Sequence, residues 1–168
     1  MGATASKAYV DKYKAKSASS GRRGILIIGI DGAGKTTITY QLLLGKHVHT
    51  VPTMGHNKET LKHDNKKYDL FDVGGSSLVR ETWRLYARAA DAIIFVVDAH
   101  DEMRLPEAAD ALKKLFFGED YDAREAKSKT ASTVQYDIPL LVFANKQDLP
   151  DALGVEKIEE LLDLHTLP

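Results

Sequence analysis

The sequence predicts a single α/β domain in which helices cover both faces of a mostly parallel sheet. The chain has 168 residues, which suits one compact domain and is too short for two. Short continuous apolar runs, typical of strands buried on both faces of a parallel sheet, occur at residues 25–28, 68–71, 93–97 and 140–143. Helical spacing fills the gaps between the last three runs, at residues 78–88 and 106–117, as in a doubly wound domain.

One segment departs from the parallel pattern. Residues 58–62 and 67–71 flank His63-Asp64-Asn65-Lys66, which predicts a β-hairpin with its turn at Asp64-Asn65. A hairpin of this kind places one antiparallel strand at the edge of the sheet. The long polar stretch 118–137 is predicted to be a surface loop.

The composition is that of a soluble globular protein, with 43% hydrophobic and 28% charged residues. The sequence contains no cysteine, which excludes disulfide bonds, a cysteine zinc cluster and palmitoylation. No apolar run approaches the ~20 residues that span a bilayer, and no secretory signal is visible. These features predict a cytosolic protein.

The charge is distributed unevenly along the chain. Residues 1–24 contain six basic residues and one acidic residue, a local charge of +5, so that residues 25–168 carry −6 of the total of −1. We therefore expect a flexible basic arm, residues 1–24, in front of a folded domain, residues 25–168. Such an arm indicates either an anionic partner, a membrane or nucleic acid, or a solubilising tail.

The segment after the first predicted strand has the pattern G-x-x-x-x-G-K-[ST], in Gly29-Ile30-Asp31-Gly32-Ala33-Gly34-Lys35-Thr36. Glycines allow the backbone N–H groups to point inward at phosphate oxygens, and the helix that follows adds its positive N-terminal end. Lys35 is expected to reach the β- and γ-phosphates, and the Thr36 hydroxyl to bind Mg²⁺. The predicted phosphate-binding residues are Asp31, Gly32, Ala33, Gly34, Lys35, Thr36 and Thr37.

Two further motifs follow predicted strands. Asp72 ends the second strand and precedes Val73-Gly74-Gly75, where a carboxylate can hold a water ligand of Mg²⁺ and the Gly75 N–H can approach the γ-phosphate. Asn145-Lys146-Gln147-Asp148 follows the last strand. The Asp148 carboxylate can accept from both N1–H and N2–H₂ of guanine, Asn145 suits the N7/O6 edge, and the stem of Lys146 can lie over the base.

These motifs, in this order and spacing, make the chain resemble the Ras-like small GTPases. Val51-Pro52-Thr53-Met54-Gly55 is similar to the first switch of the Arf and Arf-like branch, and Phe71-Asp72-Val73-Gly74-Gly75 to its second switch. The residues from Phe143 to Pro150 are close to that branch's guanine signature. The resemblance covers residues 25–168, with residues 118–137 as an insertion.

The resemblance implies a GTP/GDP switch that needs Mg²⁺, an exchange factor, an activating protein and effectors, in membrane traffic or related transport. Thr53 and the Gly75 amide would hold the γ-phosphate, and Thr53 joins Thr36 and Asp72 as a metal ligand. Lys35, Thr53, Gly75 and residue 76 would form the catalytic set. The hairpin between the switches would slide in register and displace the N-terminal arm, and a two-residue slide keeps each side chain on its own face.

Several positions depart from the family pattern. Ser76 stands where the family has the glutamine that orients the attacking water, so we expect hydrolysis that is slow or depends on a partner. His56 and Lys58 replace a phenylalanine and a valine, and the aromatic effector surface becomes His56, Phe71 and Tyr86. The chain stops at Pro168, before the family's last strand and helix, so we expect a C-terminal truncation that leaves one sheet face uncovered.

The N-terminus Met1-Gly2-Ala3-Thr4-Ala5-Ser6 fits the N-myristoylation pattern, which predicts acylation of Gly2. One acyl chain binds membranes only marginally, and the lysines of the arm would supply a second signal. With the resemblance, the expected partner of the arm is a membrane and not a nucleic acid, and the expected location is cytoplasmic with reversible membrane association.

Two other functions remain open from the sequence. Ser76 is also compatible with a GTP-locked pseudo-GTPase that acts as a binding module. A P-loop ATPase or small-molecule kinase is the third alternative, although an adenine site has no use for the Asp148 carboxylate.

Overall fold

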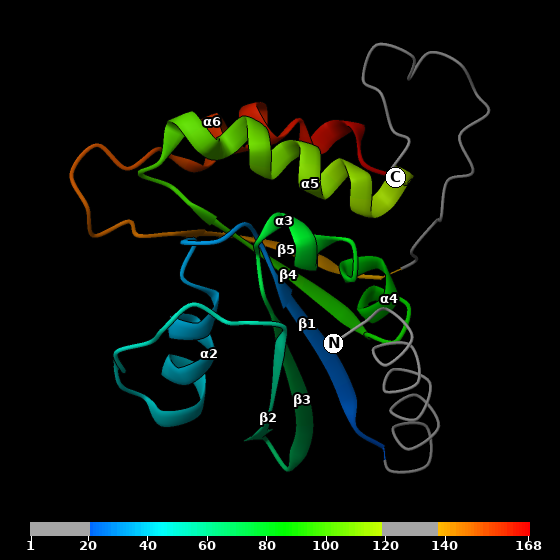
Figure 1. Cartoon of the computed structure of the whole chain (residues 1–168). Helices are drawn as coiled ribbons and strands as arrows, with labels where there is room; N and C mark the ends of the chain where they lie inside the picture. The colour runs from blue at the N-terminus through cyan, green and yellow to red at the C-terminus, as the bar shows by residue number, and fades with distance from the viewer. Residues whose placement is uncertain (1–20, 119–137) are drawn as a thin grey trace.

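A computed structural model describes residues 21–118 and 138–168 (Figure 1). The described strands form one sheet in the order β2-β3-β1-β4-β5, in which only β2 and β3 pair antiparallel. The strands are β1 (Arg23–Ile28), β2 (His56–His63), β3 (Lys66–Val73), β4 (Ala92–Asp98) and β5 (Leu140–Asn145). This mixed, mostly parallel sheet confirms the predicted fold class.

Helices lie on both faces of the sheet (Figure 1). They are α2 (Lys35–Leu44), α3 (Ser77–Arg80), α4 (Trp83–Ala87), α5 (Leu105–Phe117) and α6 (Val155–Leu162), with the short 3₁₀ segments η1 (Glu102–Arg104) and η2 (Leu164–Thr166). Helix α2 packs on one face, over a small core that includes Ile27, Leu70 and Val96. The other helices bury a larger core on the opposite face, to which Leu26 and Phe95 belong.

The predicted hairpin is present, with strands longer than the sequence indicated. The two residues between β2 and β3 both have positive φ, 47° at Asp64 and 59° at Asn65. This is the geometry of a two-residue type I′ turn, which asparagine and aspartate tolerate better than most residues. The turn predicted at Asp64-Asn65 is therefore confirmed.

The helical stretch predicted at residues 78–88 is not continuous, because α3 ends at Arg80 and α4 begins at Trp83. At the break, the Thr82 hydroxyl donates to the Val79 carbonyl at 2.7 Å, and the Thr82 N–H donates to the same carbonyl at 2.9 Å. A side chain that competes for a backbone carbonyl in this way interrupts the helical hydrogen-bond ladder.

The prediction that residues 140–143 are buried on both faces is wrong. Leu141 is 55% exposed and Phe143 is 41% exposed. Strand β5 is the outermost strand of the described sheet, and α2 packs on β2 and β3 at the other end of the same face. No helix of residues 21–118 or 138–168 therefore covers this side of β5.

Some predictions cannot be compared with the structure. The basic arm, apart from residues 21–24, and the predicted loop after Gly118 lie outside the described residues, and so does Gly2. Within the described parts of the chain, no helix has the length and apolar character that crossing a membrane requires.

Candidate functional site

The predicted phosphate-binding loop connects β1 to α2. Gly34 ends the loop with a φ of 93°, a left-handed conformation that favours glycine. A Cβ at this position would lie 2.2 Å from Nδ2 of Asn145, so the close approach also requires glycine. That Nδ2 atom donates to the Ala33 carbonyl at 2.8 Å. The phosphate loop and the predicted guanine motif, more than 100 residues apart in sequence, are thus joined.

Lys35 is the first residue of α2, and only 6% of it is exposed. Its Nζ donates to the Ile30 carbonyl at 2.9 Å, across the mouth of the loop. Burial lowers the pKa of Lys35 to about 8, although the charges of Asp72 and Asp31 oppose this effect. A buried ammonium between two acidic residues is suited to a strongly anionic ligand such as a polyphosphate.

The three predicted metal ligands, Thr36, Thr53 and Asp72, meet at one point. The Thr36 hydroxyl donates to Oδ2 of Asp72 at 2.5 Å and lies 2.9 Å from the Thr53 hydroxyl, which is itself 3.4 Å from the same carboxylate oxygen. Asp72 is fully buried, and burial raises its pKa despite the hydrogen bond from Thr36 and the charge of Lys35.

This group of atoms has the chemistry of a magnesium site. Mg²⁺ prefers hydroxyl, carboxylate and water oxygens, which are the donors present here. Within the described residues, Oδ1 of Asp72 is buried and has no hydrogen-bond partner. A water held by Mg²⁺ would donate to this oxygen, so the residues fit the ion that the sequence predicts.

The glycines of the predicted second switch lie against the predicted first switch and against the phosphate loop. The Gly74 N–H donates to the Gly55 carbonyl at 2.8 Å. A Cβ on Gly75 would lie 2.4 Å from both the Asp31 nitrogen and the Gly29 oxygen of the phosphate loop. Only a residue without a side chain can approach the loop this closely. Ser76, the next residue, is exposed.

The guanine motif begins at the end of β5. Lys146 has a φ of 64°, and its Nζ lies 2.5 Å from Oδ2 of Asp98, the last residue of β4. Asp148, the last residue of the motif, is exposed. Asp98 was not predicted, although its position after an apolar strand is the same signal that identified Asp72.

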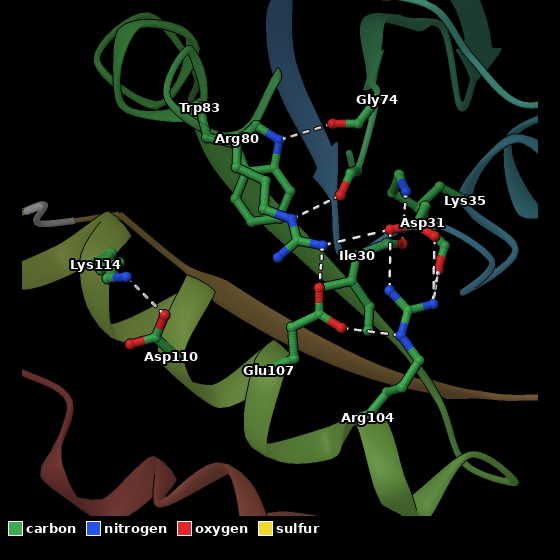
Figure 2. Close-up of polar contacts among 11 residues, drawn as sticks. Ile30, Asp31, Lys35, Gly74, Arg80, Trp83, Arg104, Glu107, Asp110 and Lys114 are labelled. Carbon is green, nitrogen blue, oxygen red and sulfur yellow. Dashed lines mark hydrogen bonds and ion pairs between the residues drawn. The ribbon is translucent and has the colours of Figure 1, made fainter. Parts of the chain in front are cut away.

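An ionic network beside the loop was also not predicted (Figure 2). Arg104 of η1 donates to the Asp31 carboxylate at 3.0 and 3.3 Å, and Arg80 of α3 donates to it at 3.3 Å. Both arginines also bind Glu107 of α5. The hydrogen bond from Arg104 lowers the pKa of Asp31. The Asp31 carboxylate is therefore directed toward α5. The hydroxyl of Thr37, another predicted phosphate-binding residue, lies 3.2 Å from that of Thr50.

The three residues of the predicted effector surface form one cluster. Nδ1 of His56 lies 2.9 Å from the Tyr86 hydroxyl, and the ring centroids of Phe71 and Tyr86 are 6.4 Å apart. Phe71 and Tyr86 are buried and His56 is partly exposed. Burial lowers the pKa of His56, which favours its neutral form.

A buried carboxylate lies next to this cluster. Asp69 of β3 accepts from Arg22 at 3.2 Å and from Thr60 at 2.8 Å, and Nζ of Lys58 lies 2.9 Å from its other oxygen. Lys58 also lies over the Phe71 ring, 5.6 Å from its centroid. The unusual lysine at position 58 is thus balanced by an acidic residue on the neighbouring strand.

Comparisons with known proteins identify the family of this chain. The model of the ADP-ribosylation factor family matches residues 10–168. The Arl6 (BBS3) small GTPase from Trypanosoma brucei, solved with a bound nucleotide analogue, GppNp, is 30% identical with a TM-score of 0.64, over 86% of this chain and 79% of that chain. The mammalian SRP receptor is 22% identical with a TM-score of 0.65, over 83% and 71% of the two chains, and shows the fold alone.

The family match covers nearly the whole sequence, and the solved relative reaches 30% identity over most of the chain. The chain belongs to the ADP-ribosylation factor family of small GTPases.

Proposed function

We propose that this protein is a molecular switch that alternates between GDP and GTP and recruits effectors in membrane traffic or related cytoplasmic transport. Family membership implies guanine-nucleotide binding, typically with Mg²⁺. The observation that supports the proposal most directly is the meeting of Thr36, Thr53 and Asp72. These residues come from the phosphate loop and from the two predicted switches, so one ligand at this point would hold both switches.

The residues of the site have distinct roles in this proposal. Lys35 and the loop N–H groups hold the β- and γ-phosphates, and the Gly75 N–H contacts the γ-phosphate. Thr36, Thr53 and Asp72 hold Mg²⁺, which supplies positive charge beside the phosphate oxygens. Loss of the γ-phosphate would release Thr53 and Gly75, and the switch segments with them.

Asp148 would select guanine over adenine. The test is a competition titration of the purified protein with GTP, ATP and XTP. We expect strong preference for GTP in the wild type and a preference for xanthine in Asp148→Asn, because a carboxamide can donate to the oxygen that replaces the N2 amino group. Wild-type protein that bound ATP as tightly as GTP would support the ATPase or kinase alternative and contradict this proposal.

Hydrolysis is expected to be slow or to depend on a partner. Ser76 is exposed at the start of α3, and its hydroxyl ends about two bonds short of the group that a glutamine would present to an attacking water. This residue also favours a second candidate function, a GTP-locked binding module without turnover. A single-turnover assay of GTP-loaded protein distinguishes the two, since only the switch converts bound GTP to GDP when an activating protein is added.

Membrane association would be weak and reversible. The proposal rests on the six basic residues of the arm and on the acylation pattern at Gly2. We expect the acylated protein to sediment with anionic liposomes at low salt and to dissociate at high salt, and Gly2→Ala to abolish sedimentation. Equal sedimentation of Gly2→Ala from a eukaryotic host would exclude the lipid anchor.

A further inference from the structure

The backbone of Gly74 and Gly75 is held at three of its four polar groups, and Figure 2 shows one of them, the Gly74 carbonyl that accepts from Trp83. The Gly74 N–H donates to the Gly55 carbonyl, Nε1 of Trp83 donates to the Gly74 carbonyl at 3.0 Å, and Nε of Arg80 donates to the Gly75 carbonyl at 2.6 Å. The Gly75 N–H makes no hydrogen bond to any described residue. It is thus the one polar group of these two residues that the described residues leave without a hydrogen bond.

The direction of that N–H depends on Trp83. The carbonyl of Gly74 and the N–H of Gly75 belong to one peptide group, and in a planar trans peptide they point in opposite directions. A donor fixed on the carbonyl side therefore sets where the N–H points. Trp83 binds the carbonyl on one side of the peptide group and so determines the direction of the N–H on the opposite side.

Trp83 is well suited to be a fixed donor. It is 1% exposed at the first position of α4, and its ring packs edge-on against Phe95 of β4 with 6.2 Å between centroids. A large side chain enclosed in the core cannot change rotamer without opening a cavity. The position of the indole is therefore set by the core as a whole and not by one neighbour.

We propose that Trp83 is a positioning residue for the γ-phosphate. Its indole N–H orients the Gly74–Gly75 peptide so that the Gly75 N–H is directed at a third phosphate before the nucleotide binds. The inference rests on the proposed function, since it needs a γ-phosphate next to Gly75. It adds a residue on another element, outside the phosphate and guanine motifs, that contributes to the distinction between GTP and GDP.

The experiment compares the dissociation constants of GppNp and GDP in the presence of Mg²⁺. Trp83→Phe keeps an aromatic ring and removes the donor, and we expect GppNp binding to weaken about tenfold while GDP binding changes less than twofold. Trp83 is the only tryptophan of the chain. It can therefore be replaced throughout by benzothienylalanine, which keeps the bicyclic shape and lacks the N–H, and the same selective loss is expected.

Phe95→Leu is the matched control. It weakens the packing around Trp83 and leaves the indole N–H in place, so it should lower stability without changing the ratio of the two constants. The inference is overturned if Trp83→Phe and the benzothienylalanine protein lose affinity equally for GppNp and GDP. It is also overturned if neither protein loses affinity for GppNp. A change in the ratio of the GppNp and GDP dissociation constants in Phe95→Leu as large as in Trp83→Phe also overturns the inference, since packing alone would then explain the effect. Wild-type protein that bound neither nucleotide would instead refute the proposed function.

Discussion

Asn145 shows how a single side chain can assemble a site from distant segments. Its amide donates to the Ala33 carbonyl, and the missing side chain of Gly34 leaves the space that this contact occupies. Neither residue can be understood alone, because the requirement for glycine at 34 comes partly from a residue on β5. At the residue scale, the site depends on such pairs, in which a small residue accommodates a polar one.

Ser76 is the residue whose identity should matter most for turnover. We expect intrinsic hydrolysis at or below roughly 10⁻⁴ per second, and we expect Ser76→Gln to raise the rate only when an activating protein is present. A glutamine can contact the attacking water and the γ-phosphate at once, but without an arginine from a partner it accelerates the reaction little. The measurement is single-turnover hydrolysis of GTP-loaded protein, with and without the partner.

Glu160→Gln is a suitable control for this series, because Glu160 is exposed on α6, pairs with Lys157 and lies outside the predicted nucleotide site. Rapid hydrolysis by the unassisted wild type would mean that another group positions the water. The argument from the length of the serine side chain would then be wrong.

At the scale of elements, the β2–β3 hairpin carries a buried charge that links it to the chain before β1. Two of the donors to Asp69, Lys58 and Thr60, belong to the hairpin itself, whereas Arg22 precedes β1. A slide of the hairpin against β1 by two residues would carry Lys58 and Thr60 along with Asp69 and would separate Asp69 from Arg22. The ion pair to Arg22 therefore favours the register in which Gly24 lies opposite Asp69.

Asp69→Asn is expected to lower the free energy of unfolding by about 2 kcal/mol at pH 7, because two cations lose the charge they bind. Burial alone would raise the pKa of Asp69, but hydrogen bonds from Lys58 and Thr60 and the charges of Lys58 and Arg22 outweigh it and lower the pKa. The contribution of Asp69 to the free energy of unfolding is therefore fully present above its pKa in the unfolded chain, about 3.9. This contribution is lost as the pH falls through the lower pKa of Asp69 in the folded protein.

The difference between wild type and Asp69→Asn should therefore be largest near neutral pH and should shrink below about pH 4. Chemical denaturation at a series of pH values measures it. Asp110→Asn is the control, since Asp110 binds Lys114 in an exposed pair and should change stability by less than about 0.5 kcal/mol. A difference that did not depend on pH would show that the Asp69 charge is not responsible.

At the scale of the whole molecule, the two faces of the sheet are covered unequally. One face packs against α3, α4, α5 and α6, and the other packs against α2 near β2 and β3 (Figure 1). Strand β5, at the opposite edge, has no charged residue and exposes Leu141 and Phe143. An uncharged edge strand with exposed apolar side chains favours association with other chains.

For the 168-residue chain we expect Leu141→Lys to reduce concentration-dependent self-association and to change the free energy of unfolding by less than about 0.5 kcal/mol. Sedimentation velocity over a range of concentrations measures the first effect. The matched control is Leu140→Lys, one residue earlier, where the side chain packs against the main core and a charge should destabilise the fold. Unchanged self-association in Leu141→Lys would show that this edge is not the contact surface.

The sequence alone determined the parts of this protein that are encoded locally. The fold class, the hairpin turn at Asp64-Asn65 and the phosphate loop follow from short-range rules of burial period, turn geometry and backbone freedom, and the structure agrees with them. The positions of Asp72 and Asn145 at strand ends, and of Thr36 at the start of the helix after β1, were predicted for a related reason, because parallel strands bring their carboxyl ends to one edge of the sheet.

Only the tertiary structure decided which side chains pair across the fold. The Asp31–Arg104 and Asp69–Arg22 ion pairs and the Trp83–Gly74 hydrogen bond have no local signature, since charged residues are common and each pair needs two elements at a particular distance and angle. The exposure of Leu141 was equally beyond the sequence pattern, because an apolar run is the same whether or not a helix covers it. Whether a segment is buried depends on the elements that pack against it, and the sequence of that segment alone does not contain this information.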